Sequence, residues 1–106
     1  MLHYTAEAPV TEVSKEFLDA FEKKYGQAPS AFAALGFDAY MVARDAIEKA
    51  GSADPQAIRD EVAKIQNFKG ATGIITLDEN GDANKSAVIK QVKDGEFIYI
   101  ETVQPD

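Results

Sequence analysis

The sequence contains no cysteine and no tryptophan, and His3 is its single histidine. The absence of cysteine excludes disulfides, thiolate nucleophiles and cysteine-based metal sites. His3 stands at the start of the chain, where ends fray, so we expect neither a Ser-His-Asp triad nor a histidine metal centre. No pair of carboxylates is marked out as a general acid and base. The sequence therefore predicts a protein that is not an enzyme and that needs no cofactor or metal.

Basic residues and long apolar runs are also scarce. The chain has 11 Lys and Arg residues against 18 Asp and Glu residues, which gives a net charge of -7. This balance disfavours binding to nucleic acid or to anionic membranes, because both require clustered positive charge. No stretch approaches the roughly 18 apolar residues of a membrane span. Residues 1–4 lack the basic and apolar regions of a signal peptide, so we expect none in this chain.

The length of 106 residues and the hydrophobic content of 45% predict one small globular domain with a thin core. Three helices are expected in its first two thirds. The first is capped by Thr11, ends at Gly26 and carries an apolar stripe at helical spacing, made of Val13, Phe17, Phe21 and Tyr25.

The second helix is expected to begin between Ser30 and Leu35 and to end at Gly51. Its predicted buried face consists of Ala39, Val42, Ala43, Ala46 and Ile47. Asp54 followed by Pro55 is a strong signal for the start of a third helix, which we expect to end near Asn67.

The remainder of the chain has the pattern of β-strands. Residues 1–9 predict an arm or short strand, and three further strands are expected at Ile74–Leu77, Ala87–Val92 and Phe97–Val103. Asp94-Gly95 between two of them favours a tight type I′ turn. The predicted fold class is therefore α/β, locally α+β: an N-terminal arm or strand, three helices and a three-stranded antiparallel meander.

Two glycine- and acid-rich motifs have competing interpretations. Gly70 and Gly73 are not followed by the Gly-Lys-Ser/Thr of a phosphate loop, so we interpret them as a bend at a strand entrance. Residues 78–82 carry oxygen ligands at alternate positions, as an EF-hand loop does. The sixth position is Ala83 instead of glycine and the twelfth is Ile89 instead of glutamate, so a hairpin connection is favoured over a metal site.

Residues 32–40 place two phenylalanines among small residues at the entrance of the second helix. Either ring can belong to the core, or one of them can face a cleft and contact an apolar ligand. Asp38 favours the start of the helix electrostatically.

Four features in this order resemble the C-terminal third of the type I periplasmic binding proteins, the solute-binding proteins of ABC transporters of the leucine/isoleucine/valine-binding kind. They are the helix end at Tyr25-Gly26 with Pro29, the Gly36-Phe37-Asp38-Ala39 segment, the capped helix after Asp54-Pro55, and the run from Phe68 through Gly70, Gly73 and Asp78–Asp82 to Asp94-Gly95. Phe37 stands where family members commonly carry tyrosine.

The resemblance implies one partial domain over residues 1–106, taken from a two-lobed fold that closes around its ligand by a hinge. Residues 10–66 resemble helices of the N-terminal lobe, 68–82 the last hinge crossing, and 86–103 the C-terminal hairpin. The resemblance also implies that Phe32 lines the ligand pocket, with Phe37 as a weaker candidate.

By the same resemblance, the parent protein would be a periplasmic or extracellular receptor for an amino acid or similar small molecule. It would deliver this ligand to the membrane permease of an ABC importer. The groups that hold an amino acid's charges lie earlier in the family's sequences, so we expect this chain alone not to bind the ligand. We also expect its uncovered helix faces to drive self-association, most simply as a dimer. The alternative is a free-standing α+β module that binds other proteins.

Overall fold

The computed structural model describes residues 5–9 and 11–105. It contains three helices, α1 (Glu12–Tyr25), α2 (Ala31–Ala50) and α3 (Pro55–Ala63). They are followed by five strands, β1 (Phe68–Gly70), β2 (Gly73–Leu77), β3 (Ala83–Asn84), β4 (Ala87–Lys93) and β5 (Glu96–Val103). The expected helices and antiparallel strands are confirmed. Residues 5–9 form no strand, and residues 1–4 of the expected arm lie outside the described residues.

The helix ends follow the capping signals of the sequence. The side chain of each N-cap accepts a hydrogen bond from the backbone three residues later, and the N-caps are Thr11, Ser30 and Asp54. Helices α1 and α2 end at Gly26 and Gly51, both in the left-handed conformation. Helix α3 stops at Ala63, short of the expected end near Asn67, and Asn67 itself has a φ of 55° that no right-handed helix accommodates.

The strands form two separate sheets instead of the single meander we expected. Strand β2 pairs with β1 on one side and with β3 on the other, whereas β4 pairs with β5. The prediction failed because β1 and β3 are only 3 and 2 residues long, too short to show a strand period, yet they occupy both edges of β2. Strand β4 therefore does not pair with β2, and it forms a hairpin with β5.

The β4–β5 hairpin contains the expected tight turn. Lys93 lies opposite Glu96, so Asp94 and Gly95 alone form the connection. Their φ angles of 52° and 79° are those of a type I′ turn, whose twist matches that of the two strands.

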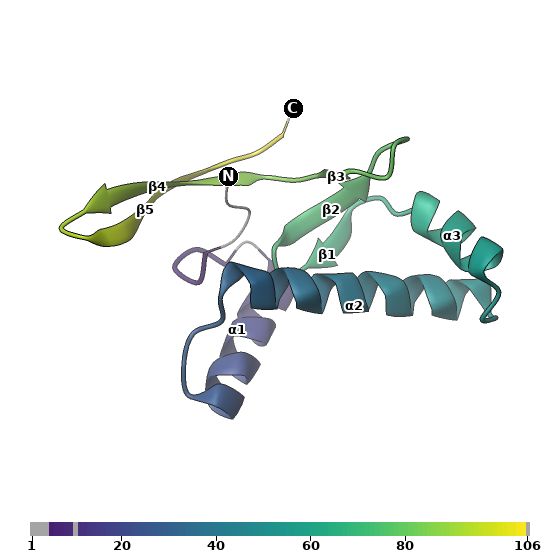
Figure 1. Ribbon diagram of the computed structural model, residues 1–106, viewed down its shortest axis with the longest axis horizontal. Coiled ribbons are helices and arrows are strands. Elements are labelled where there is room, and N and C mark those ends of the chain that lie inside the picture. Colours follow the sequence, from purple (N-terminus) through teal and green to yellow (C-terminus); the bar gives the residue numbers. More distant parts are fainter. Residues whose placement is uncertain (1–4, 10, 106) are drawn as a thin grey trace.

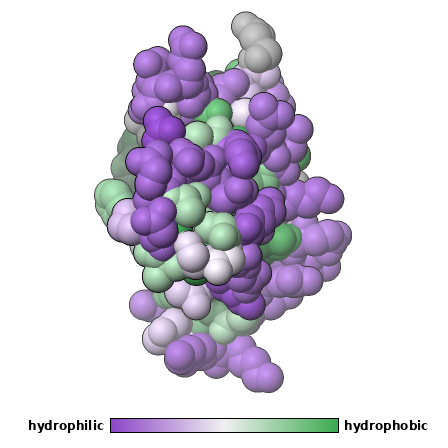
Figure 2. All heavy atoms as spheres, turned by 90° about the vertical axis from the view of Figure 1, so that its right-hand side faces the viewer, coloured by the Kyte–Doolittle hydropathy of each residue, from purple (hydrophilic) through white to green (hydrophobic). Residues whose placement is uncertain are grey.

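Helix α2 is the central element of the fold (Figure 1). It packs against α3 and β1, and α1 contacts β1 near the other end of α2. The β4–β5 hairpin extends away from the helices, and the radius of gyration is 15.2 Å, larger than the roughly 13 Å of a compact domain of this length. Figure 2 shows the side near α3, which is largely hydrophilic.

The buried face of α2 differs from the expected one. Ala34, Asp38 and Ala46 are buried, whereas Ala39, Ala43 and Ile47, which we had assigned to the core, are exposed. The helix is rotated in this way because the turn between β1 and β2 lies against Asp38 and forms hydrogen bonds with it.

The hydrophobic core of the described residues is small. Its buried apolar side chains are Ala34, Ala46, Ile65, Ala71, Ile75 and Val88. The accessible surface is 7311 Å², whereas about 5,800 Å² is typical of a folded monomer of 11.5 kDa. The chain thus exposes about 1,500 Å² more surface than a compact domain of its mass.

Candidate functional site

The tight connection between β1 and β2, which we call the β1–β2 turn (residues 70–73), is buried throughout. Gly70 pairs with Gly73 across the ladder, and Ala71 and Thr72 form the turn itself. Ala71 and Thr72 have no exposed surface. A buried turn has to find partners for its backbone polar groups inside the protein.

Asp38 of α2 supplies the acceptors for this turn. Its Oδ1 accepts from the Ala71 amide at 2.6 Å, and its Oδ2 accepts from the Thr72 amide at 2.8 Å and the Thr72 hydroxyl at 2.5 Å. Asp38 is only 4% exposed. A Cβ at Gly70 would lie 2.7 Å from Asp38 Oδ2, so the close approach of helix and turn requires glycine there.

The start of α1 supplies the donors on the other side of the turn. The Thr11 hydroxyl donates to the Gly70 carbonyl at 2.9 Å, and the Ser14 hydroxyl donates to the Ala71 carbonyl at 2.6 Å. The same two residues cap α1. One polar network therefore joins α1, α2 and the β1–β2 turn, and hydrogen bonds to a charged group make it stronger than a neutral network.

Lys85, in the short connection between β3 and β4, completes this network by donating to the Thr72 hydroxyl. Burial lowers the pKa of the Lys85 ammonium, and the nearby charge of Asp38 partly opposes this effect. The two charged residues lie at a groove of about 340 Å³ with apolar walls from α2 and the first sheet, formed by Leu35, Ala39, Val42, Ile75, Leu77 and Ala83.

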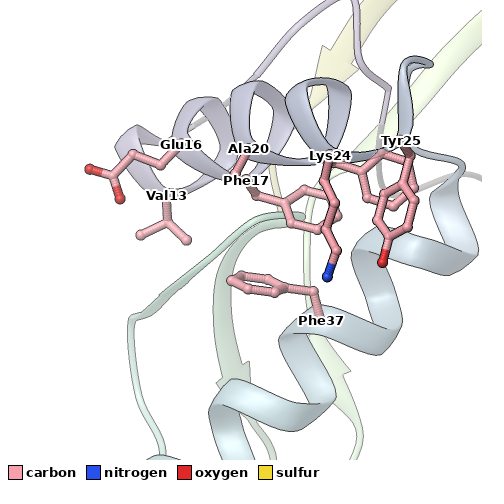
Figure 3. A pocket seen from close by; sticks show the side chains of 8 residues that line it. Val13, Glu16, Phe17, Ala20, Lys24, Tyr25 and Phe37 are labelled. Atoms are coloured by element: carbon pink, nitrogen blue, oxygen red, sulfur yellow. The ribbon is translucent and has the colours of Figure 1, made fainter.

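A larger open groove of about 500 Å³ lies between α1 and α2 (Figure 3). We call it the aromatic groove, and its lining residues are Val13, Glu16, Phe17, Ala20, Phe21, Lys24, Tyr25 and Phe37. Phe17 stacks at 5.7 Å from Phe21 and at 4.7 Å from Phe37, measured between ring centroids. Phe21 stacks in turn on Tyr25 at 4.6 Å. The contact between Phe17 and Phe37 joins α1 to α2, whereas Phe21 and Tyr25 both belong to α1, and all of these rings remain partly open to solvent.

The two aromatic residues suggested as ligand contacts lie in different environments. Phe32, in the first turn of α2, is 85% exposed. Phe37 is half-buried and packs on Phe17 in the aromatic groove. The five-residue separation turns the two side chains to different sides of α2, so the structure does not bring them together.

Asp38 is the residue whose role the sequence reasoning missed, because we assigned it only a favourable effect on the helix dipole. A signal was present in the sequence: Asp38 follows Ala34 by four residues and precedes Ala46 by eight, which places the three on one helix face. A lone carboxylate on a face of small residues indicates a hydrogen-bonded anchor.

Two classes of site find no support within the described ranges. No group of three or more His, Asp or Glu side chains there is arranged to hold a metal ion. None of the helices in the same part of the chain has the length and apolarity to cross a membrane. The described residues instead provide a buried polar network, two apolar grooves and several exposed aromatic side chains, Phe32 among them.

Comparison with known proteins places the chain in a family. Residues 1–96 match the family described as periplasmic binding protein, and the chain belongs to this family. A curated relative from Pseudomonas aeruginosa, a leucine-, isoleucine-, valine-, threonine- and alanine-binding protein, is 35% identical over 69 residues. That alignment covers 65% of this chain and 18% of the relative.

Two solved structures are similar over almost the whole chain. A leucine-binding protein of Thermotoga maritima is 48% identical with a TM-score of 0.89, over 97% of this chain and 29% of that one. A branched-chain amino acid substrate-binding protein of Streptococcus pneumoniae, solved with isoleucine, is 31% identical with a TM-score of 0.84, over 98% of this chain and 29% of that one. The chain thus spans less than a third of the length of these relatives.

Proposed function

We propose that this chain is part of the substrate-binding protein of an ABC importer and that the substrate is a branched-chain amino acid. The observation that carries the proposal is Phe32, an aromatic side chain 85% exposed on the first turn of a helix that the Asp38 network holds in place. An exposed ring on a rigid element is suited to contact an aliphatic side chain in a cleft. Membership of the periplasmic binding protein family and the amino acid ligands named for its relatives support this assignment.

The proposal assigns a role to each part of the chain. Residues 10–66 contribute to the N-terminal lobe, 68–82 form the last crossing between the lobes, and 86–103 form the C-terminal hairpin. Phe32 contacts the ligand directly. Phe37 acts on the ligand site only through its packing on Phe17.

The chain by itself does not bind free amino acids with useful affinity under this proposal. A buried zwitterion needs a partner for each of its charges, because an unpaired buried charge costs several kcal/mol. The Asp38 carboxylate already accepts three hydrogen bonds from the β1–β2 turn, and Lys85 is bound to Thr72. The groups that hold the ligand's charges therefore come from polypeptide that completes the two lobes.

The complete receptor would work without chemical catalysis, in the periplasm or outside the cell. It would pass its ligand to the membrane permease of the importer. Closure of the two lobes around the ligand would present a surface that the permease recognises.

A chimaera tests the proposal. Residues 1–106 replace the matching segment of the Thermotoga maritima leucine-binding protein, and leucine affinity is measured by titration calorimetry. We expect the chimaera to bind leucine, Phe32→Ala to weaken binding about tenfold or more, and Tyr40→Ala, which removes another exposed ring from α2, to leave it unchanged. A folded chimaera that does not bind leucine, or whose affinity is insensitive to Phe32→Ala, contradicts the proposal.

A further inference from the structure

The β4–β5 hairpin extends away from the helices and the first sheet (Figure 1). Its burial is concentrated at the base, where Ser86 and Val88 are buried, whereas Val92 and Phe97 near the turn are 67% and 68% exposed. A segment with few buried contacts along its length moves easily about the point where it is attached. The contacts at the base therefore decide the direction of the hairpin.

Lys85 lies at this base, directly after β3 and two residues before β4. Its ammonium donates to the Thr72 hydroxyl, and this hydroxyl donates in turn to Asp38 Oδ2 at 2.5 Å. A hydroxyl has one proton and two lone pairs, so it serves both partners at once. The Lys85 side chain thus attaches the connection between the two sheets to the buried β1–β2 turn, and through the turn to α2.

The charge of Lys85 strengthens this attachment. Burial lowers the pKa of its ammonium, as expected for a cation partly enclosed by protein, and the nearby charge of Asp38 opposes this effect. Hydrogen bonds from a charged donor are roughly twice as strong as neutral ones. Loss of the ammonium would free the connection, whereas Asp38 would keep its bonds to the Ala71 and Thr72 amides.

The other strand of the hairpin has a weaker contact. The Tyr99 amide of β5 donates to the Glu7 carboxylate at 3.2 Å, and this bond is exposed. Water competes for an exposed hydrogen bond, and a long side chain loses entropy when it is held, so the net contribution of the bond is small. The bond of Lys85 to the fully buried Thr72 is therefore the stronger of the two.

We propose that Lys85 is a charge-dependent latch that holds the β4–β5 hairpin in one direction relative to α2 and the first sheet. Without the ammonium, the hairpin pivots about residues 85–86 while the helices keep their positions. Helix α1 stays attached in that state, because Thr11 and Ser14 bind the turn without Lys85. The inference uses contacts within this chain alone and does not depend on the ligand proposed above.

Distances between pairs of spin labels test the latch. The chain has no cysteine, so labels attach only where cysteine is introduced. The hairpin pair combines Ala43→Cys on α2 with Glu96→Cys next to the hairpin turn, and both positions are exposed. The helix pair combines Asp19→Cys on α1 with Ala43→Cys, and Asp19 is also exposed. Double electron–electron resonance gives the distance distribution of each pair.

Lys85→Met removes the ammonium and keeps most of the side-chain length. We expect the distance distribution of the hairpin pair to become about twofold wider or more, and that of the helix pair to stay unchanged. Lys69→Met is the matched control, because it removes the same charge from an exposed lysine on β1. It should leave both distributions unchanged.

Thr72→Val tests whether the ammonium acts through the hydroxyl. It removes the acceptor of the Lys85 bond but leaves the two backbone amides bound to Asp38. We expect it to widen the distribution of the hairpin pair as Lys85→Met does. In the Thr72→Val background, Lys85→Met should add no further widening, because the two residues act as one unit. Circular dichroism verifies that each variant is folded.

Four results would overturn the latch. The first is a distribution of the hairpin pair that is already broad in the unaltered chain or that stays narrow in Lys85→Met. The second is equal widening of the helix pair, which would indicate general loosening of the fold. The third is a Lys69→Met variant that acts like Lys85→Met. The fourth is an additive effect of Lys85→Met and Thr72→Val, since residues that act through one bond cannot be additive.

Discussion

Replacing Asp38 by alanine removes the anchor of the β1–β2 turn. Two buried amides and the Thr72 hydroxyl lose their acceptor, and the Lys85 ammonium loses its nearest counter-charge. Breaking a buried charged network of this kind costs about 3–5 kcal/mol. A domain of this size has about 5–15 kcal/mol in total, so we expect Asp38→Ala to be stable only marginally and its melting midpoint to fall by more than about 12 °C.

Asp38→Asn removes the charge of the side chain and keeps its volume, so it separates the two contributions to stability. The amide keeps one acceptor oxygen but directs N–H groups at a donor of the turn. We therefore expect a smaller loss of about 1.5–3 kcal/mol. The free energy of unfolding is measured by urea titration with circular dichroism at one fixed protein concentration, because association shifts the apparent stability.

A double-mutant cycle that combines Gly70→Ala with Asp38→Ala tests the contact between the turn and Asp38 directly. Gly70→Ala alone should be destabilising, because its Cβ would meet the Asp38 carboxylate at 2.7–2.8 Å. In the Asp38→Ala background the collision is absent, so the same substitution should cost little further. The sum of the single effects should therefore exceed the effect of the double variant. Additive effects, or a loss below about 1 kcal/mol for Asp38→Ala, would refute the anchoring role.

Three further substitutions follow from the structure. Phe32→Ala should change the free energy of unfolding by less than about 0.5 kcal/mol, because the ring is 85% exposed, and a loss of 3 kcal/mol in urea titration would place it in the core instead. Phe37→Ala should cost about 2 kcal/mol, because the half-buried ring packs on Phe17, and intact stability by the same assay would contradict this packing. Burial lowers the pKa of Lys85 from its ordinary value of 10.5, so between the lowered pKa and 10.5 the unfolded chain binds more protons and the stability of the native protein rises with pH relative to Lys85→Met. The free energy of unfolding of both proteins is measured up to pH 10.5, and that of the unaltered protein should rise relative to that of Lys85→Met. Parallel curves would exclude burial as the cause of the lowered pKa.

The sequence determined the local structure with some accuracy. Thr11 and Asp54 marked two helix starts, because capping hydrogen bonds involve residues only three positions apart, and the range expected for the second helix start, Ser30 to Leu35, includes its N-cap Ser30. Asp94-Gly95 likewise specified its turn through the backbone preferences of two residues. The ordered features also led to the family that the comparison with known proteins shows.

Only the tertiary structure decided the contacts between residues distant in the chain. Asp38 and Thr72 are 34 positions apart, and nothing in the periodicity of either segment shows that one completes the hydrogen bonds of the other. The pairing of β2 with the short strands β1 and β3, and the placement of Phe37 against Phe17, are of the same kind. Local patterns state which face of an element is apolar, but its partner is set by the competition among all faces for burial and for hydrogen bonds, which is settled when the whole chain folds.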